Sequence, residues 1–203
     1  MSCISLVLFD LDGVLCNYDR PAHIAHIAHL VGKDPAEVYE GIGASGFDAD
    51  ADAGKVSAAE YLRGFGPRIG RALTAEEWLE GRRAATTAAW DVLDVAAAVR
   101  RTARLAVLSN NTTLVTEYID VLLPALRPFF GDAIHVSAEF GAAKPSPAVY
   151  LRCLAVLAAL PASTLFVDDL EENVLGARAA GLRAWRHTSA TSLDGVMRDY
   201  HLL

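Results

Sequence analysis

Apolar runs of strand length alternate with helical stretches through the second half of the chain. The runs, each bounded by polar or turn-forming residues, cover residues 105–108, 133–136, 165–167 and 182–185. The stretches between them, whose apolar residues recur with helical spacing, cover residues 112–123, 147–160 and 170–180. Short apolar strands joined by helices predict a parallel sheet that is covered on both faces and binds ligands at the carboxyl ends of its strands.

The first part of the chain has a different pattern. Residues 4–9 form one more apolar run, but from residue 21 to residue 87 strand signals are few and helix starts recur. Ser57 and Thr74 are each followed three residues later by glutamate, which is the spacing of a capping box. In that motif the hydroxyl and the carboxylate bind the free N–H groups of a first helical turn, so both positions predict helix starts.

This change of pattern divides the chain. We expect residues 1–15 and 91–203 to form an α/β core with a Rossmann-like parallel sheet, and residues 16–90 to form an all-helical insertion after the first strand. Within the insertion, the glycine-rich residues 41–47 and the aspartates that follow them predict a loop.

Composition narrows the class of protein. The chain has 203 residues, 53% of them hydrophobic, enough to bury a core in one domain with or without a smaller insertion. No apolar run reaches membrane-spanning length and no basic region precedes the first run, so we expect a soluble, unexported protein without a membrane partner. Cys3, Cys16 and Cys153 are an odd number without metal-ligand spacing, which favours a reducing compartment, the cytoplasm.

The charge distribution bears on possible partners. The net charge is −7, and Lys and Arg are scattered, so the basic stripe of a nucleic-acid-binding protein is missing and no nucleic-acid partner is expected. An acidic protein still binds phosphate where a few cations and a metal ion are concentrated in one cleft, because distant charges are screened. The sequence leaves the oligomeric state, monomer or homodimer, open.

Polar side chains follow the first two strands at their ends. The first apolar run leads into Asp10 and Asp12, and Gly13 after them lets the chain turn sharply. The second strand ends in Ser109 and Asn110, whose hydroxyl and amide groups suit phosphoryl oxygens. Each pattern alone is also typical of an ordinary turn or helix cap.

Two later strand ends add an ammonium group and two further acids. Lys144 follows the third strand in a loop that two prolines stiffen. Asp168 and Asp169 end the fourth strand, and because successive strand residues point to opposite sides, we expect Asp168 to be a direct metal ligand with Asp169 behind it. The carboxyl ends of parallel strands share one edge, so all these groups should converge.

In chain order, these strand ends resemble the motifs of the haloacid dehalogenase-like superfamily, and specifically its phosphatase branch. The four segments that carry the resemblance are residues 9–14, Ser109-Asn110, Lys144-Pro145, and Val167-Asp168-Asp169 with Asn173 and Gly176-Ala177. They span nearly the whole chain. Val14 stands where many members carry threonine, and valine is also common there. Dehalogenating members replace the acid at Asp12, so carbon–halogen chemistry is not expected.

The resemblance implies catalysis through an aspartyl-phosphate. Asp10 would be the nucleophile. Asp12 would protonate the leaving alcohol and then take a proton from the attacking water. Ser109, Asn110 and Lys144 would bind the phosphoryl group, and Lys144 would also offset the charge of the carboxylates.

The resemblance also implies Mg²⁺ as the cofactor. Its ligands would be Asp10, the backbone carbonyl of Asp12 and Asp168, with Asp169 close behind and water completing the octahedron. In the family this ion neutralises charge between the two oxyanions that react.

Residues 16–90 correspond to the small helical cap of that family, which closes over the cleft and selects the substrate. By analogy the substrate is a small phosphorylated metabolite, with a sugar phosphate favoured. Two alternatives stay open. A phosphomutase would return the phosphoryl group to the sugar, and a non-catalytic regulatory module would bind phosphate without turnover.

Other polar and aromatic residues have structural interpretations. His23, His26 and His29 recur at every third position and predict a surface stripe beside apolar core residues.

Arg82 and Arg83 predict a solvated helix face, and Trp78 and Trp90 predict core positions in the insertion. Cys16 lies near the expected cleft but lacks a neighbouring base, so a packing role is favoured over a nucleophilic one.

Overall fold

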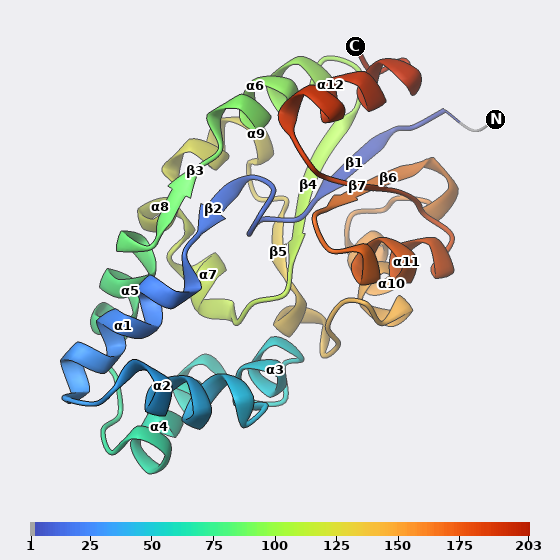
Figure 1. Ribbon diagram of the computed structural model, residues 1–203. Coiled ribbons are helices and arrows are strands. Elements are labelled where there is room, and N and C mark those ends of the chain that lie inside the picture. The colour runs from blue at the N-terminus through green and yellow to red at the C-terminus, as the bar shows by residue number, and fades with distance from the viewer. Residues whose placement is uncertain (1–2) are drawn as a thin grey trace.

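The computed structural model describes residues 3–203 (Figure 1), with a helix-covered sheet and a group of helices beyond one edge of it. Five parallel strands pair in the order β5-β4-β1-β6-β7. Their bounds are β1 (Leu6–Phe9), β4 (Arg104–Ser109), β5 (Ile134–Val136), β6 (Thr164–Asp168) and β7 (Arg183–Arg186). The predicted α/β class is confirmed, and each predicted strand is present with its ends shifted by at most two residues.

The central strand determines where the site lies. Phe9, the last residue of β1, pairs with Val107 of β4 on one side and with Val167 of β6 on the other. The backbone N–H of Asp10 then donates to the Val167 carbonyl at 2.8 Å. Asp10 therefore emerges at the carboxyl edge of the sheet, between two neighbouring strand ends.

Alternate residues of the strands are buried on opposite faces of the sheet. Leu8 and Phe166 pack on one face with helices α10 (Pro147–Val156) and α11 (Glu171–Ala179). Phe9 and Val167 pack on the other face, beneath helices α6 (Trp90–Val99), α7 (Thr113–Glu117), α8 (Ile119–Leu122), α9 (Arg127–Phe130) and α12 (Ala190–Asp199). Three 3₁₀ turns complete this part of the chain, at Pro124–Leu126, Ser137–Phe140 and Pro161–Ser163.

Two helices are shorter than predicted. The helix expected over residues 112–123 is interrupted at Tyr118, whose φ of −112° departs from helical geometry. Helix α10 ends at Val156, and Ala158 in the turn that follows has a φ of 47°. Pro161 comes shortly afterwards, and a proline restricts the residue before it to extended conformations.

Residues 16–90, hereafter the cap segment, hold most of the helices beyond the sheet edge. They are α1 (Arg20–Val31), α2 (Pro35–Tyr39), α3 (Phe47–Asp52), α4 (Ala58–Ile69) and α5 (Ala75–Ala84). Both predicted capping boxes are confirmed, at Ser57 with Glu60 and at Thr74 with Glu77.

The sequence predicted an all-helical cap segment, but the segment is not helical throughout. It contains two short strands, β2 (Cys16–Tyr18) and β3 (Thr86–Ala88), which pair antiparallel where the chain leaves the sheet and returns to it. Here backbone pairing joins two segments that are distant in sequence, which no local pattern reveals.

The loop predicted at residues 41–47 is confirmed only in part, because it is limited to a turn at Ser45 and Gly46. Glu40–Ala44 form a π-helical turn, and the aspartates that follow belong to α3. The ring of Phe47 stacks on Tyr61 at 5.2 Å and meets Phe65 edge-on at 6.3 Å. This aromatic packing stabilises α3 despite the three aspartates in its sequence.

Tryptophan positions agree with the prediction in one case. Trp78 is buried, whereas Trp90 is 62% exposed at the start of α6.

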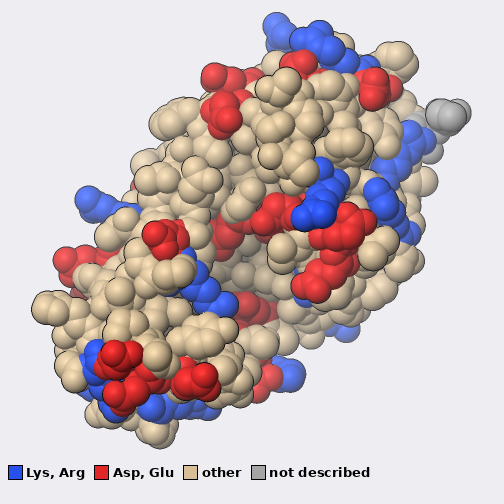
Figure 2. Space-filling model, viewed as in Figure 1, with Lys and Arg blue, Asp and Glu red and all other residues tan. Residues whose placement is uncertain are grey.

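Within residues 3–203, no helix combines the length and the apolar composition needed to cross a bilayer. On the face shown in Figure 2, basic and acidic side chains are interspersed, and acidic groups gather at the hollow between the cap segment and the core.

Candidate active site

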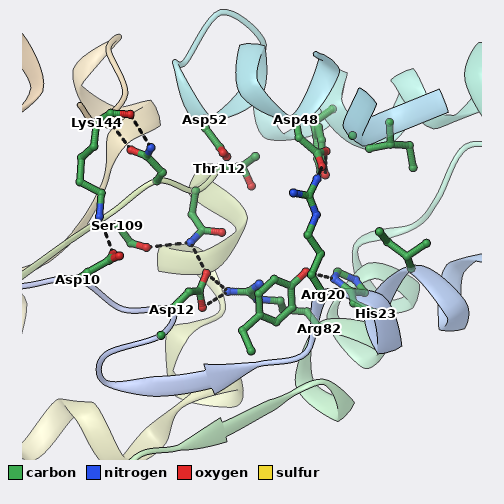
Figure 3. A pocket seen from close by; sticks show the side chains of 18 of the residues that line it. Asp10, Asp12, Arg20, His23, Asp48, Asp52, Arg82, Ser109, Thr112 and Lys144 are labelled. Atoms are coloured by element: carbon green, nitrogen blue, oxygen red, sulfur yellow. Dashed lines mark hydrogen bonds and ion pairs between the residues drawn. The ribbon is translucent and has the colours of Figure 1, made fainter. Parts of the chain in front are cut away.

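The strand ends bring most of the predicted residues to one cleft (Figure 3), whereas Asp168 is fully buried beside it. The Nζ atom of Lys144 lies 2.7 Å from Oδ1 of Asp10 and 2.7 Å from Oδ2 of Asp168. All three side chains are buried. Burial alone would lower the pKa of Lys144, but the two carboxylates outweigh it and raise that pKa, so the side chain stays an ammonium.

Asn110 holds the loop that carries Lys144. Its Nδ2 donates to the Lys144 carbonyl at 2.9 Å, and its Oδ1 accepts from the Lys144 backbone N–H at 2.8 Å. This two-point contact ties the end of β4 to the lysine loop. Asn110 was predicted to bind the phosphoryl group together with Lys144. In the structure its side chain positions the loop of Lys144.

Asp168 and its neighbours form an oxygen-rich cluster. Asn173 Nδ2 donates to both oxygens of Asp168, at 3.0 and 3.1 Å, and the Leu170 N–H donates to one of them at 2.9 Å. Asp10, Asp168 and Asp169 each offer an oxygen, and these atoms lie within 4.8 Å of one another. Asp169, expected behind Asp168, is therefore close enough to share an ion with it.

The cluster has the composition and the charge that suit Mg²⁺. Carboxylate oxygens are ligands that Mg²⁺ prefers. Three carboxyl groups surround the single ammonium of Lys144, which contacts two of them. Burial raises the pKa of Asp10, with Lys144 opposing the shift, and a divalent cation would offset this cost. Asp10, Asp168 and Asp169 would hold the ion.

Gly13 makes room for this cluster. Its φ is 82°, in the left-handed region, and a Cβ there would lie 2.5 Å from Oδ2 of Asp169. Glycine meets both requirements because it lacks a side chain and tolerates positive φ.

Asp12 is held by donors from three segments. Nη2 of Arg82 lies 2.6 Å from Oδ1 and 2.7 Å from Oδ2 of Asp12. Asn111 Nδ2 also donates to Oδ2 at 3.0 Å, and the Cys16 thiol donates to Oδ1 at 3.4 Å. Burial acts to raise the pKa of Asp12, but Arg82 and the other donors outweigh it, so that pKa is lowered.

Arg82 corrects the prediction of a solvated arginine pair. It is only 3% exposed, whereas the adjacent Arg83 is exposed. Its guanidinium stacks 3.5 Å from the ring centroid of Tyr18 while it pairs with Asp12. The cap segment thus supplies a cation to the acid at the tip of β1.

His23 corrects the prediction of a surface stripe. It is buried, and its Nδ1 shares a 2.8 Å hydrogen bond with the Tyr18 hydroxyl. Gly81 of α5 allows this burial, because a Cβ there would lie 2.9 Å from Cδ2 of His23. Burial, reinforced by Arg82, lowers the pKa of His23 to about 3, so the ring is neutral.

Two residues that follow β4, Asn111 and Thr112, line the site in a way that the sequence did not reveal. Asn111 Nδ2 bridges Asp12 and the buried Ser109, whose Oγ accepts from it at 3.0 Å. Thr112 is 6% exposed and lines the same cavity, and its Oγ1 has no hydrogen-bond partner among the described residues. The polar run after β4 was a signal for both, whereas nothing in the sequence around Arg82 distinguishes it from Arg83.

Comparison with known proteins identifies the family of the chain. The family model of the haloacid dehalogenase-like hydrolases matches residues 4–181. The chain belongs to this family. It is a hydrolase.

Relatives of this hydrolase include phosphatases. It is 31% identical to the phosphatase MT3486 of Mycobacterium tuberculosis, over 97% of this chain and 93% of that one. It is 26% identical to the D-ribitol-5-phosphate phosphatase of Bacteroides thetaiotaomicron, over 84% of this chain and 85% of that protein.

Solved structures share the fold of the hydrolase. A haloacid dehalogenase family enzyme of Bacteroides thetaiotaomicron superposes with a TM-score of 0.82 at 21% identity, over 97% of this chain and 100% of that one. A second crystal structure of that enzyme is a complex with magnesium and inorganic phosphate. It superposes with a TM-score of 0.77 at 21% identity, over 91% of this chain and 94% of that one.

Proposed function

We propose that the protein is a Mg²⁺-dependent phosphatase that acts on a small phosphomonoester, with a sugar or polyol phosphate favoured. The convergence of Lys144 with Asp10 and Asp168 at 2.7 Å carries this proposal, because it offers a nucleophile, a cation and metal-binding oxygens within one cleft. A phosphatase relative that acts on D-ribitol 5-phosphate supports the substrate class.

The first half of the reaction transfers the phosphoryl group to the enzyme. An oxygen of Asp10 attacks phosphorus, and the bond from phosphorus to the alcohol oxygen breaks. Asp12 gives its proton to the departing alcohol. Lys144 and Ser109 bind the phosphoryl oxygens as charge shifts among them. Bound Mg²⁺ would supply charge neutralisation between the two anions that meet.

The second half regenerates the enzyme. Asp12, now ionised, takes a proton from water, and the water oxygen attacks phosphorus. The bond from phosphorus to Asp10 breaks, so inorganic phosphate leaves and the carboxylate returns. Arg82 and Asn111 stabilise the ionised form of Asp12 that this step requires.

Phosphate release from a panel of sugar, polyol and aryl phosphates tests the proposal. We expect turnover that a chelator abolishes and Mg²⁺ restores. Asp10→Asn should lower kcat by about 10⁴-fold or more, since it removes the nucleophile and keeps the shape. Asp132→Asn, at a fully exposed side chain, is the matched control and should keep wild-type activity.

Two outcomes would contradict the proposal. Unchanged turnover by Asp10→Asn would exclude the nucleophile. An isomerised sugar phosphate formed without free phosphate would indicate a phosphomutase instead.

A further inference from the structure

A cavity continues from the catalytic carboxylates into the cap segment. Its volume is about 420 Å³, within the range of small-ligand sites. Apolar side chains from three cap helices form part of its wall, among them Ile24, Phe65 and Trp78. A phosphoryl group placed at Asp10 would direct the alcohol part of the substrate into this space.

The cations that line the cavity are already paired. Arg82 pairs with Asp12, and Lys144 pairs with Asp10 and Asp168.

Arg20 likewise pairs with Asp48 at 2.5 Å, and Asp48 also accepts from the Tyr61 hydroxyl at 2.8 Å. Histidine contributes no charge there, because His23 is neutral.

Two polar side chains in the cavity lack partners. The carboxylate of Asp52 makes no hydrogen bond or ion pair with any residue from 3 to 203 that the structure describes, although it lines the cavity. The Oγ1 of Thr112 is buried and equally unpartnered there. Figure 3 shows both side chains at the wall of the cavity. Buried polar groups normally have partners, so a ligand is the expected partner of the Thr112 hydroxyl, and the half-buried carboxylate of Asp52 faces the same space.

The position of Asp52 is fixed by the core rather than by the cap alone. Its backbone carbonyl accepts a 2.6 Å hydrogen bond from Ser137 Oγ, and a Cβ on Gly54 would lie 2.4 Å from the Ala138 carbonyl oxygen. The end of α3 therefore lies directly against the core. Burial, reinforced by Asp48, raises the pKa of Asp52 to about 7, as expected for a carboxylate without a donor.

We propose that Asp52, with Thr112, selects the alcohol part of the substrate by binding its hydroxyl groups and excluding alcohols that carry a carboxylate. This inference rests on the proposed phosphatase function. The Asp52 carboxylate accepts hydrogen bonds from hydroxyls, and the Thr112 hydroxyl both donates and accepts. A second carboxylate in this low-dielectric space meets the like charge of Asp52, and the cations that the structure describes on the cavity wall are already paired.

A hydroxyl group suits the cavity better than an ammonium group. The guanidinium groups of Arg20 and Arg82 line the same walls, but each is paired with an aspartate, so hydrogen bonding decides between the two ligands: an ammonium group only donates, whereas a hydroxyl group also accepts. A hydroxyl can donate to Asp52 and accept from Thr112 without adding charge. The favoured substrates are thus phosphates of neutral polyhydroxy alcohols.

Matched substrate pairs test the inference. Each pair consists of a linear polyol phosphate and the acid in which a terminal hydroxymethyl group is replaced by a carboxylate. We expect the wild-type protein to prefer the polyol by about 10²-fold in kcat/KM. Asp52→Asn should lower kcat/KM for the polyol about tenfold and raise it for the acid, so that the preference largely disappears.

Two further variants make the result specific. Thr112→Val keeps the shape of the side chain and should cost activity on the polyol while the discrimination against the acid persists. Asp50→Asn removes a carboxylate from the exposed side of the same helix, where it pairs with Lys55 at 2.6 Å, and should leave both rates unchanged.

The outcomes separate this inference from the proposed function. Two results would overturn the role of Asp52 and leave the proposed function standing. The first is a ratio of kcat/KM between the acid and the polyol that Asp52→Asn leaves unchanged. The second is a wild-type preference for phosphates of carboxylic acids or amino alcohols. A wild-type protein that releases phosphate from no ester at all would overturn the proposed function, and this inference with it.

Discussion

The carboxylate of Asp12 accepts hydrogen bonds from Arg82, Asn111 and Cys16, and these contacts occupy both of its oxygens. Such an arrangement favours the ionised form, which is the form that takes a proton from water in the proposed second half-reaction. Donation of a proton to the alcohol requires one of these contacts to open. The arginine of the cap segment is therefore coupled to the acid–base chemistry of the core.

Removal of Arg82 should change the pH dependence of turnover. Arg82 lowers the pKa of Asp12, so Arg82→Ala raises it. The ionised form is then lost at a higher pH, and the acidic limb of the kcat profile should move toward neutral pH. Arg83→Ala changes an exposed arginine of the same helix and should leave the profile unchanged. An acidic limb that stays in place in Arg82→Ala would contradict this account of Asp12.

Residues of this kind mark where sequence reasoning fails. Asp12 precedes Arg82 by 70 positions, and the contact depends on how the cap segment meets the sheet. His23 is likewise covered by α5, a distant helix, through space that Gly81 leaves free. Asp10, Lys144 and Asp168 could be predicted because each follows a strand whose end is visible in the local pattern.

Helix α11 packs closely against the loop that carries Lys144. A Cβ on Gly176 would lie 2.1 Å from the carbonyl oxygen of Pro145, the residue after Lys144. The Tyr150 hydroxyl of α10 also donates to the Asn173 carbonyl of α11 at 2.7 Å. The two helices and the loop therefore pack as one layer behind the Lys144 ammonium.

Gly176→Ala should displace this loop and move Lys144 away from Asp10. We expect a loss of stability of about 1–3 kcal/mol from overpacking, and a kcat reduced by at least about tenfold. Urea unfolding and steady-state kinetics measure the two effects. Gly195→Ala in α12 is the matched control, because a Cβ there meets nothing within 4 Å and helix propensity favours alanine by about 1 kcal/mol. Wild-type activity and stability in Gly176→Ala would show that the loop tolerates the displacement.

At the level of elements, local signals sufficed for the strands and for the capping boxes, because hydrophobic periodicity and cap chemistry act within a few residues. They failed for α3, where Phe47 packs against Tyr61 and Phe65 of another helix and overrides an aspartate-rich sequence. They also failed for β2 and β3, whose pairing joins residues separated by the whole insertion.

In the whole molecule, the cap segment and the core meet around one cavity. Arg82 contacts Asp12, and the Asp52 carbonyl contacts Ser137, so each unit supplies part of the cavity wall. The core half could be predicted from the order of motifs along the chain, and the family that those motifs indicated is confirmed. The cap half depends on tertiary contacts between helices, which is why the residues proposed to select the substrate emerged only from the structure.

The central claim is that Asp10 becomes phosphorylated during turnover. Acid quenching of the working enzyme, followed by borohydride reduction and peptide mass spectrometry, tests it most directly, because an acyl phosphate is reduced where a free carboxylate is not. The account predicts conversion of Asp10 to homoserine in the wild-type protein, dependent on substrate and Mg²⁺, and no such product from Asp10→Asn. Reduction at another carboxylate, or an unmodified Asp10 in protein quenched during rapid turnover, would contradict it.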